Sequence, residues 1–96
     1  MDQAHFLNTI VQLTEAHVNG AVSGEEFVRQ YDDLMADELP DLIKPEFLRL
    51  LDLYHLDCAM YQPDPKLRGG VEGLYGDEEL QKKSRQFLED LHSMDA

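Results

Sequence analysis

Hydrophobic residues recur at steps of three and four along the first part of the chain, the pattern of a helix with one apolar face. We predict this helix over residues 4–18, ending at Asn19 and Gly20, because both residue types tolerate the left-handed conformation that closes a helix. The next helix is expected to follow after a short turn and to run antiparallel to the first. The apolar stripe of the first helix is Phe6, Leu7, Ile10, Val11, Thr14 and Val18.

The stretch VSGEEF, residues 22–27, predicts the start of the second helix. Ser23 is a favourable N-cap, and Glu26 three residues later completes the pattern of a capping box. Val22 and Phe27 have the spacing of a hydrophobic staple. We expect the helix to end before Pro40, since the residue that precedes a proline disfavours the helical conformation. Its core face is predicted to contain Phe27, Tyr31, Leu34 and Met35.

A third helix is predicted from Pro45, a residue that suits the first helical position, to the stop at Pro63. Its hydrophobic residues cover so wide an arc that we expect a central helix packed against several neighbours. They are Phe47, Leu48, Leu50, Leu51, Leu53, Tyr54, Leu56 and Met60.

Residues 62–76 contain four glycines and two prolines, which predict one long connection without regular structure. A loop of this length in a small domain is usually functional or mobile. Asp77 is expected to cap a last helix whose stripe is Leu80, Ser84, Phe87, Leu88, Leu91 and Met94. The predicted fold is therefore all-α: one domain over residues 1–96, an antiparallel four-helix bundle with a long loop between helices three and four.

Charge narrows the choice of partner. The chain carries 20 acidic and 8 basic residues, a net charge of -12 at pH 7. Residues 25–64 hold 11 acids and 3 bases, whereas residues 65–96 hold 7 acids and 5 bases. The acidic middle also has regular apolar positions, so we interpret it as folded surface and not as a disordered tail. Such a field repels nucleic acid and anionic membranes and attracts basic proteins.

The single cysteine, Cys58, cannot form an internal disulfide, which fits a reducing compartment. The first residues lack the basic region of a signal peptide, and no apolar run approaches the length of a membrane span. We therefore expect a cytoplasmic protein that binds neither membranes nor nucleic acid directly.

Catalytic and metal chemistry find little support in the sequence. The histidines lack the spacing of a zinc site, and the acidic run at residues 32–41 lacks the glycine of a calcium-binding EF-hand loop. Cys58 on a predicted helix is more typical of a small core residue than of a nucleophile. We expect no catalytic residue, no cofactor and no metal. The histidines, which we interpret as surface or partly buried residues, are His5, His17, His55 and His92.

Three segments together resemble the colicin D immunity family: VSGEEF, then LLDLYHLDCAMYQPDPKLR at residues 50–68, then GDEELQKKSRQFLEDL at residues 76–91. The resemblance covers nearly the whole chain. It implies a small acidic four-helix protein that blocks the tRNA-cleaving C-terminal domain of a bacteriocin or of a contact-dependent growth-inhibition toxin. It also implies that acids around the Pro-Asp segment enter the basic cleft of the toxin, and the matching position here is Asp64.

A carboxylate held between Pro63 and Pro65 would lose little freedom on binding, and it could take the place of a substrate phosphate. Tyr61 would supply an aromatic anchor beside it. The alternative is that the two prolines and Asp64 only stop a helix and turn the chain. The predicted toxin-binding residues are Asp64, Tyr61, Asp57, Gln62, Glu72, Asp32 and Asp33.

Two other functions stay open at this point. The first is an acidic, antitoxin-like or regulatory module that mimics nucleic acid and binds a different basic protein. The second, a small metal or redox enzyme, has the weaker support. A toxin gene directly before the gene for this chain would distinguish an immunity protein from the first alternative.

Overall fold

The computed structural model describes residues 2–70 and 72–94, and this part of the chain is all-helical, which confirms the predicted fold class. No strand occurs within it. The α-helices begin and end within a few residues of the predicted limits, with one unexpected addition, α4. The helices are α1 (Gln3–Val18), α2 (Gly24–Asp37), α3 (Pro45–Ala59), α4 (Pro65–Arg68) and α5 (Asp77–Met94).

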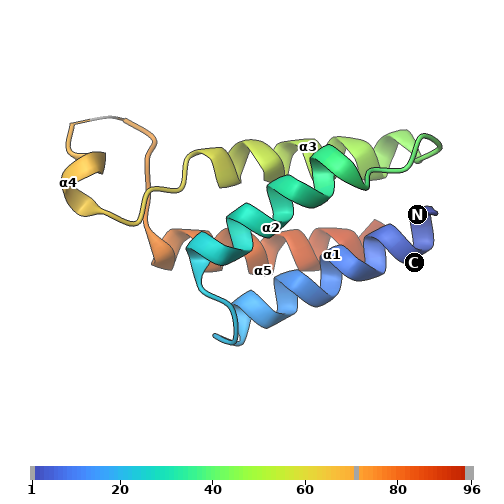
Figure 1. The fold of residues 1–96 in the computed structure, drawn as a ribbon, viewed down its shortest axis with the longest axis horizontal. Coiled ribbons are helices and arrows are strands. Elements are labelled where there is room, and N and C mark those ends of the chain that lie inside the picture. The colour runs from blue at the N-terminus through green and yellow to red at the C-terminus, as the bar shows by residue number, and fades with distance from the viewer. Residues whose placement is uncertain (1, 71, 95–96) are drawn as a thin grey trace.

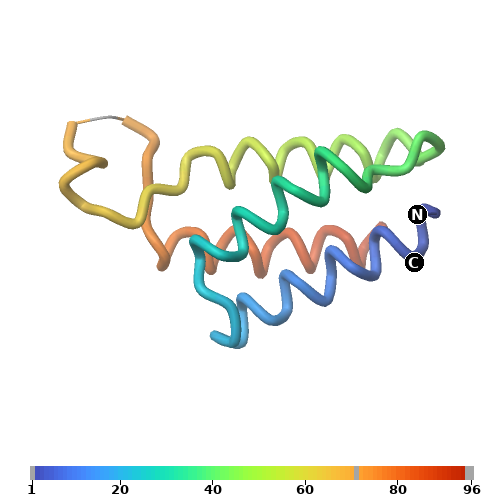
Figure 2. Tube along the Cα trace, in the orientation of Figure 1, coloured from blue at the N-terminus to red at the C-terminus, as the bar shows by residue number. Residues whose placement is uncertain are grey.

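The long helices run lengthwise through an elongated molecule of 40 × 24 × 22 Å. In Figure 1, α1 and α3 run in one direction, and α2 and α5 run in the other. The main packing partners of α1 are α2 and α5, and α3 packs against the same two helices. Each long helix therefore has two principal neighbours. The trace in Figure 2 shows the segment with α4 projecting at one end.

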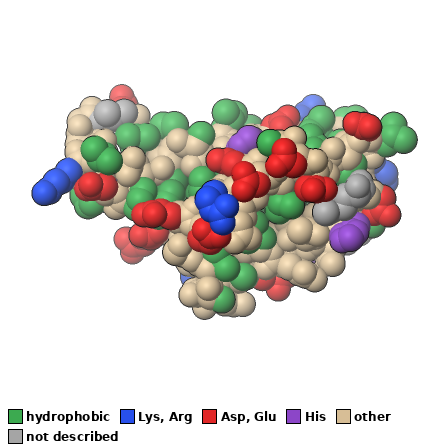
Figure 3. Space-filling model, viewed as in Figure 1, with side chains coloured by type: hydrophobic (Ala, Val, Ile, Leu, Met, Phe, Trp, Pro, Cys, Tyr) green, Lys and Arg blue, Asp and Glu red, His purple; other side chains and the backbone are tan. Residues whose placement is uncertain are grey.

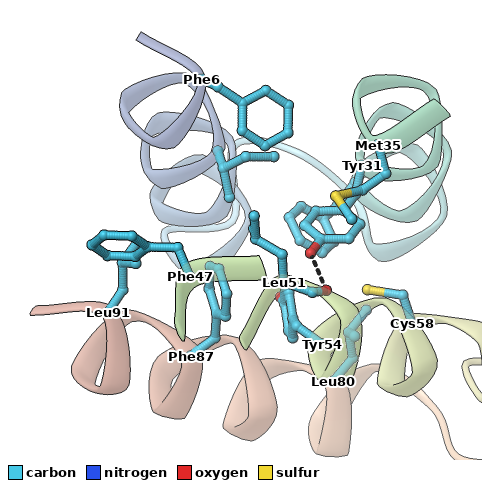
Figure 4. Close-up of a cluster of buried hydrophobic side chains, with 12 residues drawn as sticks. Phe6, Tyr31, Met35, Phe47, Leu51, Tyr54, Cys58, Leu80, Phe87 and Leu91 are labelled. Atoms are coloured by element: carbon cyan, nitrogen blue, oxygen red, sulfur yellow. Dashed lines mark hydrogen bonds between the residues drawn. The ribbon is translucent and has the colours of Figure 1, made fainter. Parts of the chain in front are cut away.

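The core lies where the inner faces of the long helices meet (Figure 4). The Tyr31 hydroxyl donates a hydrogen bond to the carbonyl oxygen of Leu51 at 2.7 Å. The hydroxyls of Tyr54 and Ser84 hydrogen-bond to each other. Both buried tyrosines thus satisfy their polar atoms, as a close-packed interior requires. The core residues are Phe6, Ile10, Phe27, Tyr31, Met35, Phe47, Leu51, Tyr54, Cys58, Leu80, Phe87 and Leu91.

The predicted central position of α3 is wrong. Leu53 and Leu56 are 56% and 66% exposed. The helix has α2 and α5 as its main neighbours, so only one stripe can be buried. At about 100° per residue, both leucines point away from that stripe. The helix also ends at Ala59, before Pro63. The buried stripe of α3 is Phe47, Leu51, Tyr54 and Cys58.

The connection between α3 and α5 is more regular than predicted. It contains α4, which begins directly after Asp64. Its base is closed by a parallel bridge between Tyr61 and Tyr75. There the Tyr75 N–H donates to the Met60 carbonyl at 3.1 Å, and the Gln62 N–H donates to the Tyr75 carbonyl at 2.8 Å. We call residues 62–76 the excursion. Its two ends are held together, and α4 occupies part of its length.

The start of α2 confirms half of the predicted capping box. The Ser23 hydroxyl accepts a hydrogen bond from the Glu26 N–H at 3.2 Å. The Glu26 carboxylate does not return to Ser23; it binds the side chains of Arg29 and Gln30. These bonds lower the pKa of Glu26, with Arg29 as the first cause. A basic residue one turn further along thus competes for the carboxylate of the box. Val22 packs against the core that contains Phe27.

Candidate protein-binding surface

Asp64 is an exposed residue at the start of α4. Its carboxylate accepts a hydrogen bond from the Lys66 N–H at 2.9 Å, the contact of a helix N-cap. Its carbonyl oxygen accepts from the N–H groups of Leu67 and Arg68. Pro65 occupies the first helical position, where the missing N–H has no cost. The Pro-Asp-Pro segment is therefore a helix start that displays a charged group to solvent.

Tyr61 joins three parts of the molecule. Its hydroxyl donates to the carboxylate of Asp77. Asp77 is the first residue of α5 and not the cap predicted for it. The same hydroxyl lies over Gly24 at the start of α2, where an added Cβ would be only 2.6 Å from the hydroxyl oxygen. Burial, followed by the hydrogen bond to Asp77, raises the pKa of Tyr61. Its ring is half-buried, so much of this predicted anchor is already used inside the chain.

Gln62 and Glu72 lie in the same excursion. The side-chain oxygen of Gln62 accepts a hydrogen bond from the Asp64 N–H at 3.2 Å. Gln62 therefore helps to set the backbone that carries Asp64, which the sequence did not indicate. Glu72 is exposed. The excursion thus presents two exposed carboxylates at the end of the molecule where α4 projects.

Asp32 and Asp33 lie on the outer side of α2. The Asp32 carboxylate is 2.8 Å from Nε2 of His55 on α3, and its side chain is 51% exposed. Asp33 is 3.5 Å from a guanidinium nitrogen of Arg29. Figure 3 shows acidic side chains gathered over α2 on this face. Pairs at such exposed positions are weak, so both carboxylates can exchange their present partners for those of a binding protein.

Asp57 lies in the last turn of α3, on the side that faces α5. Its carboxylate is 3.7 Å from Nζ of Lys83. The Lys83 ammonium also stands over the ring of Tyr75, 5.5 Å from the ring centroid. The Tyr75 hydroxyl in turn donates to the backbone carbonyl of Asp57. This predicted contact residue is thus tied to α5 and to the base of the excursion.

The predicted residues lie in three places: on α2, between α3 and α5, and in or beside the excursion. Asp32 pairs with His55 on the α2 side of α3, and Asp57 pairs with Lys83 on the α5 side. Between them Cys58 is almost completely buried. Burial, followed by the charges of Asp32 and Asp57, raises the pKa of Cys58 to about 12. The thiol therefore stays protonated at neutral pH, in agreement with its interpretation as a core residue.

Sequence reasoning missed two features of this surface. Asp52 is exposed on α3 and adds a carboxylate between the predicted ones. Leu53 and Leu56 were assigned to the core but lie on the surface. Counting helical angles from the buried Leu51 would have placed all three on the outer side of α3. The sequence does not show how many helices pack against α3, and this number determines which of its apolar residues are buried.

The histidines have separate surroundings. His17 is buried and stacks on the ring of Phe27 at 4.8 Å, and its Nδ1 is 3.3 Å from the carbonyl oxygen of Val22. His55 contacts Asp32 and the edge of the Tyr31 ring. In the part of the chain that the structure covers, no three His, Cys, Asp or Glu residues are grouped so that they could hold a metal ion.

None of the helices in the described part of the chain combines the length and the apolar character needed to cross a bilayer.

Comparison of this chain with protein-family models, with curated proteins and with solved structures finds no match.

Proposed function

We propose that this chain is an immunity protein: a non-enzymatic, cytoplasmic inhibitor of a tRNA-cleaving toxin domain from a bacteriocin or a contact-dependent growth-inhibition system. The observation that carries the proposal is the density of carboxylates on and after α2. Residues 25–41 contain seven acids and one base. Among these acids, Asp32 and Asp33 are displayed on a helix whose other face is locked into the core through Tyr31. The sequence segments that resemble the colicin D immunity family also favour a tRNA-cleaving toxin domain as the partner.

The scaffold in this proposal is an antiparallel four-helix bundle of α1, α2, α3 and α5, with the excursion as its one long connection. A ribonuclease cleft is lined with Lys and Arg side chains that hold phosphates. Carboxylates at fixed positions can bind those cations with little loss of conformational freedom. Asp64 suits this role because its N-cap bond fixes the carboxylate while leaving it exposed. The acids then exclude the tRNA by occupying its cleft.

The test uses the C-terminal domain encoded by the open reading frame adjacent to the gene for this chain, which we expect to be a ribonuclease toxin domain. Co-expression is expected to restore growth, and the two proteins are expected to co-purify. The purified chain is expected to inhibit tRNA cleavage and to compete with tRNA for the domain. A stable ternary complex of toxin, tRNA and this chain would disprove occlusion of the cleft. Absence of any complex, with an unrelated basic protein bound instead, would favour the antitoxin-like or regulatory module.

A further inference from the structure

The outer face of α3 carries two leucines that are more than half exposed in the described part of the chain. Leu53 and Leu56 are one helical turn apart and are 56% and 66% exposed. We call this pair the α3 ridge. The hydration of large apolar side chains on an exposed helical face is unfavourable. A contiguous apolar surface with a polar border is typical of an interaction site.

Two hollows adjoin Leu53 and extend the apolar surface at this end of the ridge. One, of about 310 Å³, lies between α3 and α5, and Tyr54 and Phe87 contribute to its wall. The other, of about 430 Å³, lies toward the start of α3, and Met94 contributes to its wall. Both hollows are lined by Leu50 and Leu53. The surface can therefore receive apolar side chains on two sides of Leu53.

Charged residues border this apolar surface, and acids outnumber bases among them. Asp52 lies one turn before Leu56 on α3. Asp57, Asp90 and the basic residue Lys83 line the hollow on the α5 side, and Glu46 and Arg49 line the other hollow. An apolar centre with a charged rim is the usual composition of a protein interface. The excess of acids favours a basic partner. A second copy of this chain would bring another net charge of -12 to the interface, whereas a basic protein would pair its Lys and Arg residues with the carboxylates of the rim.

We propose that the α3 ridge is the apolar centre of the interface with a basic protein, and that this protein is the toxin domain. The inference rests on the proposed function and adds a second contact surface to it. The partner places apolar side chains against Leu53 and Leu56 and a basic side chain at Asp52. A second basic side chain reaches Asp57, which exchanges its weak, partly exposed pair with Lys83 for it. The two parts act on different steps: the rim accelerates association, and the desolvated centre slows dissociation.

The test is the double variant Leu53→Ala with Leu56→Ala, measured by surface plasmon resonance on an immobilised, catalytically inactive toxin domain at low and high salt. Alanine preserves the helix. We expect the dissociation constant to rise roughly tenfold or more at both salt concentrations, mainly through faster dissociation. Asp52→Asn is expected to slow association at low salt and to have little effect at high salt. The matched control is Leu42→Ala, the same change at a leucine that is 90% exposed and lies outside the helices.

The outcomes separate the two proposals. If the double variant binds the toxin domain as tightly as Leu42→Ala does, the α3 ridge is not in the interface, although the proposed function stands. If the unmodified chain does not bind the domain at all, the proposed function and this inference both fail. If sedimentation shows that the unmodified chain is a dimer which the double variant dissociates, the ridge belongs to a second copy, and the inference is overturned. Circular dichroism of each variant establishes that it is folded.

Discussion

Acids that we expect at an interface occur both on the outer faces of α2 and α3, which carry Asp32 and Asp52, and in the excursion, which carries Asp64. The two regions fix the positions of these carboxylates in different ways. Asp32 and Asp52 lie on helices whose inner faces are packed into the core through Tyr31 and Leu51. Asp64 is held by local contacts, because α4 contributes no buried residue. On the helical surface, charge can therefore be changed without affecting the fold. In the excursion, the same carboxylate supplies both the charge and the cap.

The largest difference is expected when one leucine is shortened in each region. Leu51→Ala removes a fully buried side chain that α3 packs into the core, and we expect it to lower the free energy of unfolding by about 2–5 kcal/mol. Leu67→Ala changes a side chain of α4 that is 63% exposed, and we expect a change within about 0.5 kcal/mol. Urea denaturation measures both. A comparable loss in Leu67→Ala would mean that α4 is part of the cooperative core.

Two substitutions of Asp64 distinguish the effect of its negative charge on binding from the effect of its N-cap hydrogen bond on stability. Asp64→Asn keeps an N-cap residue and removes the charge, so we expect stability to be retained while toxin binding weakens by about 2–5 kcal/mol. Asp64→Ala removes both and is expected to lose about 1 kcal/mol of local helix stability as well. The matched control is Asp2→Asn, because Asp2 is likewise an exposed N-cap, at the start of α1, and accepts a hydrogen bond from His5 N–H. Binding of Asp64→Asn equal to that of the control would assign Asp64 to the cap alone.

Substitutions at the start of α2 are expected to change the free energy of unfolding by a smaller amount. Ser23→Ala removes the observed bond to the Glu26 N–H, and we expect a loss of about 1 kcal/mol in the free energy of unfolding. Glu26→Ala is expected to cost less than about 0.5 kcal/mol, because its carboxylate binds exposed neighbours instead of closing the box. Chemical denaturation of the two single variants gives the order. Equal losses would show that the full capping box forms in solution.

The smallest expected difference between the two regions concerns their stability at alkaline pH. Burial raises the pKa of all four tyrosines, Tyr31 and Tyr54 in the core and Tyr61 and Tyr75 at the base of the excursion. Above about pH 10 the unfolded chain releases phenolic protons that the folded chain retains. The unfolded state then binds fewer protons, so stability is complete below that pH and falls as the pH rises.

Ultraviolet absorbance of tyrosinate follows this titration. We expect no native tyrosine to ionise with its ordinary midpoint, and we expect Tyr61 and Tyr75 to ionise before the core pair because local opening of the excursion exposes them. Tyr61→Phe and Tyr54→Phe assign the steps. If Tyr31 and Tyr54 ionise first, the helical core opens more readily than the excursion does.

Much of the fold follows from the sequence because its causes are local. Ser23 bonds to a group three residues away, and Pro45 occupies the first turn of its helix. The inner stripes of the long helices follow from a period of 3.6 residues. Even the start of α4 is encoded locally, by Asp64 and Pro65, although the glycines of the excursion concealed it.

Tertiary structure decided which of these side chains contact one another and which face solvent. The Tyr61–Asp77 bond spans 16 residues, and the Asp57–Lys83 pair joins two helices across the excursion. Neither contact leaves a periodic signal in the sequence. Leu56 is as hydrophobic as Leu51, and only the limited number of helices around α3 leaves it in solvent. Hydrophobicity sets how strongly a side chain avoids water, whereas the geometry of packing determines which side chains find room in the core.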